Sequence, residues 1–225
     1  MLQHEQKVVT PTGTAIFPHL VTPDNYEGSL AYKVSLKLDP AANGVQELLA
    51  SITAAAEEEL KRGKAALKKK GGKHAATAKE LALQLPFEPE YDDNGDETGL
   101  VILKAKSKAA GITDKGKEWE RKIPLFDAKR KKIPHGSVDI WSGSRLNVEL
   151  VTNCYTAPGL KIAGVSFYIH AVQVISLAGG FDGSDGSGFG VEEGGFDGPE
   201  LEEQSASTIP ETESGLAAPD DSSDY

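Results

Sequence analysis

The clearest indication of the fold is the stretch RLNVELVTNCYTAPGLKIAGVSFYIHAVQVISL, residues 145–177. Two segments rich in β-branched and aromatic residues, 145–155 and 162–177, flank the turn formers Ala157-Pro158-Gly159. Two such segments joined by a short turn are typical of a long antiparallel hairpin. The sequence therefore predicts a mainly β protein.

Three upstream segments, 7–21, 29–38 and 100–108, also have the composition of strands. In 29–38, apolar residues at every second position alternate with small or basic ones, which predicts a half-buried strand with a basic outer face. Residues 43–85 instead have apolar side chains at helical spacing, with a break at Gly71-Gly72. Five principal strands with one helical insertion predict a small barrel.

Charge divides the chain into two parts. The 225 residues have a net charge of -10, but residues 178–225 hold 13 of the 34 acidic residues and none of the 24 basic ones. We therefore predict a mildly basic folded domain, 1–177, and a disordered acidic tail, 178–225, which is too poor in apolar residues to fold. Long blocks of one charge sign are often interaction tails. The candidate interaction residues close the chain: Asp220, Asp221, Asp224 and Tyr225.

Several classes of protein are excluded by composition. No apolar run reaches the roughly 18–20 residues that a membrane span needs, and the N-terminus lacks the pattern of a secretory signal. The single cysteine, Cys154, excludes an intrachain disulfide and a cysteine-based zinc site. A cytoplasmic protein without membrane contact is expected.

The sequence offers no positive evidence for catalysis. It contains neither a phosphate-binding Gly-x4-Gly-Lys-Ser/Thr loop nor Gly-x-Ser-x-Gly, and no histidine is paired at metal-ligand spacing. We therefore expect no enzyme activity, no cofactor and no metal. One weaker alternative is a nuclease that holds Mg²⁺ on Asp92 and Asp93, although a solvated turn explains these carboxylates better.

The folded part combines basic and aromatic residues, which is what binding of single-stranded nucleic acid requires. Lys104, Lys106 and Lys108 point the same way on their strand, because side chains alternate with period two. Trp119, Trp141 and Tyr155 are the candidate stacking residues. The candidate phosphate-binding residues are Lys104, Lys106, Lys108, Arg121, Lys122, Lys129, Arg130, Lys131, Lys132, Arg145 and Lys161. This combination predicts a non-enzymatic protein that binds single strands without sequence preference.

The acidic tail suggests two roles. Tethered beside a basic groove, it competes with nucleic acid at high effective concentration. Alternatively, the chain is a protein-interaction adaptor that acts through this tail and uses the barrel as a scaffold.

The segments 138–148 (VDIWSGSRLNV) and 163–174 (AGVSFYIHAVQV) resemble the single-stranded DNA-binding proteins of tailed bacteriophages. The segments 13–20 (GTAIFPHL) and 32–36 (YKVSL) are similar to the opening strands of that family, and Trp141 matches the family's aromatic residue before Ser-Gly. The helical insertion, with its basic segment 61–73, departs from the family pattern.

The resemblance implies a five-stranded OB-fold barrel that coats single-stranded DNA during phage replication and recombination. It also implies that the acidic tail contacts replication proteins such as a polymerase or helicase, and that the protein can form homodimers.

Overall fold

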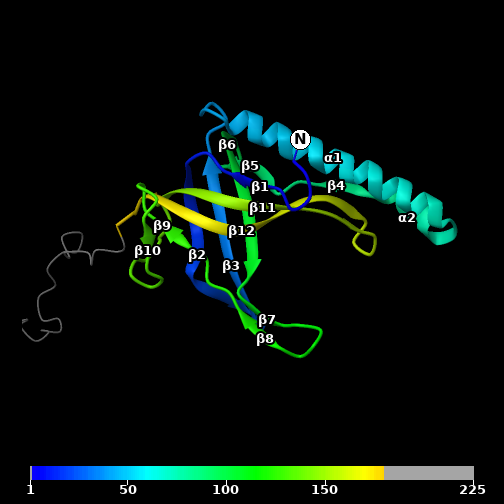
Figure 1. Cartoon of the computed structure of the whole chain (residues 1–225). Coiled ribbons are helices and arrows are strands. Elements are labelled where there is room, and N and C mark those ends of the chain that lie inside the picture. Colours follow the sequence, from blue (N-terminus) through cyan, green and yellow to red (C-terminus); the bar gives the residue numbers. More distant parts are fainter. Residues whose placement is uncertain (1, 180–225) are drawn as a thin grey trace, which may run out of the picture. The chain divides into compact units, whose positions relative to one another are not determined.

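The computed structural model describes residues 2–179, which form a mainly β structure with two helices (Figure 1). The strands are β1 (Lys7–Val9), β2 (Gly13–Tyr26), β3 (Ser29–Leu38), β4 (Ala82–Gln84), β5 (Phe87–Tyr91), β6 (Glu97–Lys108), β7 (Ala110–Ile112), β8 (Glu118–Glu120), β9 (Leu125–Phe126), β10 (Lys132–Ile133), β11 (Arg145–Ala157) and β12 (Ile162–Ser176). The helices are α1 (Val45–Lys70) and α2 (Gly72–Glu80).

The predicted long hairpin is confirmed as β11 and β12. These antiparallel strands stay paired from Leu146 opposite Val174 to Ala157 opposite Ile162, with a bulge between Glu149 and Leu150. Along one sheet the strands follow the order β10-β9-β12-β11-β2-β3-β6-β5, while β1 pairs with β11 and β4 with β12. The segments predicted as strands therefore all contain strands.

A contact outside the ladders joins the end of β6 to β12. The buried Ser107 hydroxyl accepts a hydrogen bond from the Ile169 backbone N–H at 2.7 Å and donates one to the Ile169 carbonyl at 3.1 Å. In pairing order these strands are separated by β3, β2 and β11, so this contact bends the sheet back on itself. The side chains enclosed by the bend, including Leu36, Leu103, Leu150 and Ile169, form the core.

Helix α1 packs on this core through the apolar residues whose spacing predicted it, from Val45 to Ala56. Farther along, the buried Glu59 carboxylate accepts a hydrogen bond from Thr156 Oγ1 at 2.7 Å and pairs with Arg62. The helix passes so close to β11 that a Cβ on Gly63 would lie 2.5 Å from the same hydroxyl. These contacts fix α1 over the β11–β12 hairpin, where Figure 1 shows it.

The structure refines two expectations. The helical part of the insertion ends at Glu80, because residues 82–84 instead form β4 against β12, whereas the predicted break at Gly71-Gly72 is confirmed. The number of strands exceeds the five expected, because short strands such as β8 and β9 have only two or three residues and show no alternation in the sequence.

The predicted acidic tail lies outside the described residues, apart from its first two. Within the described part, neither helix is long and apolar enough to cross a membrane.

We predict that Ser107→Ala lowers the free energy of unfolding by about 1–3 kcal/mol, because it leaves the buried N–H of Ile169 without its partner. Urea denaturation followed by circular dichroism measures this change. The control is Ser35→Ala, since Ser35 is half-buried on β3 and its hydroxyl makes no hydrogen bond within the described residues. Equal losses in the two variants would contradict a special role for the contact.

Candidate nucleic-acid interface

Basic side chains gather on the outer face of β3 and β6. On β6 every second residue from Leu103 to Ser107 is buried, so Lys104, Lys106 and Lys108 are all exposed on the other face, as predicted. The two strands are in register, and Lys33 on β3 lies directly opposite Lys106. The pairing therefore adds a fourth lysine to the predicted three.

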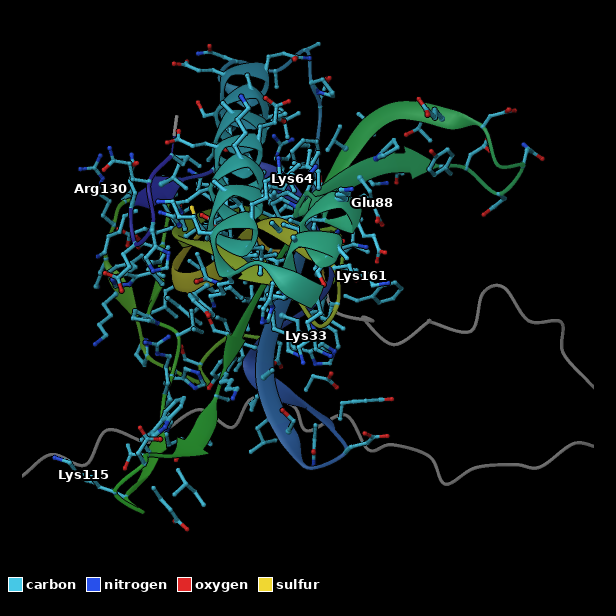
Figure 2. All side chains as sticks on the ribbon, turned by 90° about the vertical axis from the view of Figure 1, so that its right-hand side faces the viewer. Lys33, Lys64, Glu88, Lys115, Arg130 and Lys161 are labelled. Atoms are coloured by element: carbon cyan, nitrogen blue, oxygen red, sulfur yellow. The ribbon has the colours of Figure 1, made fainter. Side chains whose placement is uncertain are left out.

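These lysines line a cleft of about 660 Å³, which we call the main cleft. One wall is the outer face of β3 and β6, and the rim is the segment from Gln84 to Pro86, which is held beside β6 because the Pro86 carbonyl accepts a hydrogen bond from the Lys104 N–H at 2.8 Å. The β11–β12 hairpin supplies the remaining wall with residues that include Tyr155, Ser166 and Tyr168. Figure 2 shows Lys33 on β3, with Lys161 and Glu88 near the same side of the structure.

Two tyrosines lie on the hairpin wall of the main cleft. On β11 and β12, Val151 is opposite Tyr168, and Asn153 donates a hydrogen bond to Ser166 Oγ at 2.9 Å, so these side chains share one face. Tyr168 is 46% exposed, which leaves ring surface free for another planar group. Burial raises the pKa of the Tyr155 hydroxyl.

Within residues 2–179, no carboxylate lines the main cleft. Two acids nevertheless hold its lysines from outside, because Asp24 pairs with Lys33, and Glu88 accepts a hydrogen bond from Lys104 at 2.5 Å. The hydrogen bond from Lys33 keeps the pKa of Asp24 below its ordinary value. The cleft is thus basic, with two of its cations partly neutralised at its edges.

Other predicted residues line neighbouring clefts. Arg121 and Lys122 line a cleft of about 280 Å³ that shares Tyr168 with the main cleft. The chain is fixed there because Arg121 N–H donates to the Ala109 carbonyl at 2.7 Å. Farther along β12, Arg130 lines a third cleft of about 480 Å³. Basic residues therefore continue along β12 beyond Tyr168.

Trp119 lies on the β7–β8 hairpin in a fourth cleft, of about 910 Å³. This cleft shares Lys108 with the main cleft but also contains Glu27, Glu118 and Glu120. The indole covers the backbone of Gly111, where a Cβ would lie 2.9 Å from the ring, so only one ring face is available. Despite its size, this cleft suits a polyanion less well than the main cleft does.

The remaining predicted residues do not line these four clefts. Trp141 is 52% exposed in the turn before β11, and Arg145 begins that strand. Lys161 lies at the tip of the β11–β12 hairpin and pairs with Glu80 at 2.6 Å. The turn between β9 and β10 and the start of β10 hold Lys129, Lys131 and Lys132.

This arrangement was compared with known proteins. No family model matches the sequence, and no curated protein sequence matches it. The structure is similar to gp2.5, a single-stranded DNA-binding protein encoded by bacteriophage T7, with 23% identity and a TM-score of 0.63 over 86% of this chain and 99% of that chain. It is also similar to the single-stranded DNA-binding protein of bacteriophage Enc34 in complex with single-stranded DNA, with 12% identity and a TM-score of 0.51 over 78% and 89%.

The fold is that of these phage single-stranded DNA-binding proteins. The resemblance inferred from the hairpin motifs is thus confirmed at the level of the fold. The motifs overlap β11 and β12, and these strands supply the hairpin wall of the main cleft.

Sequence reasoning missed one lysine and one tyrosine of the main cleft. Lys33 had a usable signal, because the alternation in residues 29–38 placed it on the basic outer face. Tyr168 had a weaker one, because it alternates with the buried Phe167 and Ile169 inside a mostly apolar strand, and the register with Val151 is needed to place it.

Asp92 and Asp93, which a nuclease would use to hold Mg²⁺, lie in the turn between β5 and β6. Asp92 Oδ1 accepts hydrogen bonds from the backbone N–H groups of Asn94 at 2.8 Å and Asp96 at 2.9 Å. The bond from Asp96 contributes most to holding the pKa of Asp92 below its ordinary value. This carboxylate therefore stabilises the turn.

The rim of the main cleft depends on Gly164. A Cβ at this position would lie 1.9 Å from the Gln84 carbonyl oxygen, so β4 can pair with β12 only beside a glycine. We predict that Gly164→Ala displaces β4 and lowers the free energy of unfolding by about 1–3 kcal/mol.

Thermal or urea denaturation tests this expectation, and faster hydrogen exchange at residues 82–84 would report the displaced strand. The matched control is Gly159→Ala in the hairpin turn, where a Cβ meets nothing within 4 Å. A Gly164 variant as stable and as protected as the Gly159 variant would contradict the assignment.

Proposed function

We propose that the chain binds single-stranded DNA in the main cleft. The observation that carries the proposal is one cleft that combines four lysines and two tyrosines, with no carboxylate from the described residues in its lining. Single strands are bound by cations that follow the phosphates and by aromatic rings on which bases stack. A strand in this cleft meets Lys33, Lys104, Lys106 and Lys108 on one wall, and both tyrosines on the other.

Electrostatics favour the main cleft over the larger cleft of Trp119. Three glutamates against one lysine line the latter, so a phosphate there faces repulsion as well as attraction. We therefore propose that Tyr155 and Tyr168 make the principal stacking contacts. Beyond Tyr168 the strand follows Arg121 and Lys122 along β12, as the cleft that shares this tyrosine suggests.

The proposed function includes a specific assignment of the fold. We propose that β2, β3, β6, β11 and β12 form the five-stranded barrel of an OB fold, closed where Ser107 meets Ile169. The folded domain would comprise residues 1–177, with 178–225 as a separate acidic tail. OB folds bind oligonucleotides on a barrel face of this kind.

The wider role follows from the proposed binding and from the neighbours in structure. One of them is in complex with single-stranded DNA. We propose that this chain coats and protects single-stranded DNA in phage replication and recombination without catalysing a reaction, and that its acidic tail competes for the cleft and contacts replication proteins. The adaptor alternative predicts instead that the domain has no affinity for DNA.

Stacking on Tyr155 and Tyr168 predicts how variants at these positions change the affinity for DNA. Replacing Tyr155 or Tyr168 by Ala should weaken binding of oligo-dT by about 1–3 kcal/mol, or roughly 5- to 150-fold, because each ring stacks on a base. Fluorescence anisotropy with labelled oligo-dT measures the change, and Phe at the same positions should retain affinity.

The control is Tyr91→Ala, since Tyr91 is 56% exposed on β5 and lies outside the main cleft. If both main-cleft variants remain folded and bind like the wild type, the stacking assignment is wrong.

The pair between Glu88 and Lys104 predicts a gain of affinity. Glu88→Gln frees Lys104 for a phosphate, so binding should tighten by up to about fivefold, which is the usual range of an exposed ion pair. The plot of log affinity against log salt should steepen by up to about 0.7.

Glu57→Gln on the exposed surface of α1 changes the net charge equally and serves as the control. An equal gain in both variants would show that net charge alone, and not Lys104, is responsible.

A further inference from the structure

A second basic surface lies outside the clefts, on the end of α1 and on α2. We call residues 61–79 the basic arm. It contains no Asp or Glu and eight basic residues: Lys61, Arg62, Lys64, Lys68, Lys69, Lys70, Lys73 and Lys79. Among the described residues, Arg62 is the only one of these eight in an ion pair, whereas Lys33 and Lys104 in the main cleft both have carboxylate partners.

Helix stability explains only some of these cations. Lys68, Lys69 and Lys70 occupy the last turn of α1, where a positive charge complements the negative end of the helix dipole. Lys73 lies instead in the first turn of α2, which has no acidic residue, and there the dipole disfavours a cation. A charge that weakens its own helix points to a role in binding.

The arm is held against the hairpin by a small apolar cluster. Leu67, Ala78 and Leu81 pack on Ala163 at the start of β12, and this cluster is separate from the main core. The apolar side is thus covered, while Lys68, Lys69, Lys70 and Lys73 are exposed. Figure 2 shows Lys64 on α1 and Lys161 on the hairpin near the same side of the structure.

The basic arm is continuous with the rim of the main cleft. The rim residue Gln84 belongs to β4, which pairs with β12 from Ala82 opposite Ile162 to Gln84 opposite Gly164. Immediately before β4, Glu80 at the end of α2 pairs with Lys161. The rim therefore leads, through β4 and Leu81, directly to the end of α2.

We propose that the basic arm binds the phosphates of the same DNA strand where it leaves the main cleft, and so lengthens the binding site beyond the barrel. This inference rests on the proposed function. The arm presents cations without Phe, Tyr or Trp, so its contribution is contacts to phosphates. Only oligonucleotides long enough to extend past the rim gain these contacts.

The test compares two lengths of oligo-dT on the full chain, about 6 and about 20 nucleotides, chosen within and beyond the range of one OB fold. The arm variant is Lys68→Gln with Lys73→Gln, since glutamine is as good a helix former as lysine. The control variant is Lys115→Gln with Lys117→Gln, in the β7–β8 turn outside the main cleft.

We expect the arm variant to lose affinity for the long oligonucleotide only. Each lost contact lowers the salt slope by about 0.7, which corresponds to roughly fivefold in affinity at 0.1 M salt. Two contacts therefore reduce affinity for the long oligonucleotide up to about 25-fold. Binding of the short oligonucleotide, and both affinities of the control variant, should stay as in the wild type.

Three results would overturn the inference while leaving the proposed function intact. In the first, the arm variant binds both oligonucleotides with wild-type affinity. In the second, it loses equal affinity for both lengths. In the third, it loses as much affinity for duplex DNA of the long length as for the long single strand. Wild-type protein that binds neither oligonucleotide would refute the proposed function itself.

Discussion

The contact between Ser107 and Ile169 determines where the candidate site lies. Its two buried hydrogen bonds hold the end of β6 on β12, although three strands separate them in the sheet. The residues on either side of Ser107 are the exposed Lys106 and Lys108, and the residue before Ile169 is Tyr168. Because side chains alternate, this one buried contact places the exposed lysines of β6 beside the exposed tyrosine of β12 on the outer surface.

The size of a cleft does not decide its ligand here. The largest of the four clefts contains Trp119 and one lysine, but its three glutamates oppose a polyanion. The main cleft is smaller, and none of the described carboxylates lines it. Exposed ion pairs contribute only about 0–1 kcal/mol. The acids that hold Lys33 and Lys104 can therefore be displaced by phosphates, and they keep those side chains in position until then.

The strands and the first helix could be predicted because each has a repeated pattern. Alternation revealed β3, and helical spacing from Val45 to Ala56 revealed α1. Strands of two or three residues, such as β9, have no such pattern and are formed by pairing with residues far along the chain, here Val172 and Gln173 of β12.

The candidate site could be predicted only in part. Lys104, Lys106 and Lys108 followed from the geometry of a single strand, and Tyr155 was selected as an aromatic residue near a basic one. The position of Tyr168 in the main cleft depends on the pairing of β11 with β12. The position of Trp141 outside the four clefts depends on the fold of the turn before β11. Composition identifies the kinds of residue that bind nucleic acid, whereas only the register shows which of them meet.

The most direct measurement is photochemical cross-linking of the full chain to oligo-dT that carries 5-iodouracil, with the cross-linked peptides identified by mass spectrometry. Because a stacked base touches its aromatic partner, we predict adducts at Tyr155 and Tyr168. These adducts should disappear when unlabelled oligo-dT is added in excess. Adducts confined to Trp119 or Trp141, with none at the two tyrosines, would show that the DNA does not stack in the main cleft.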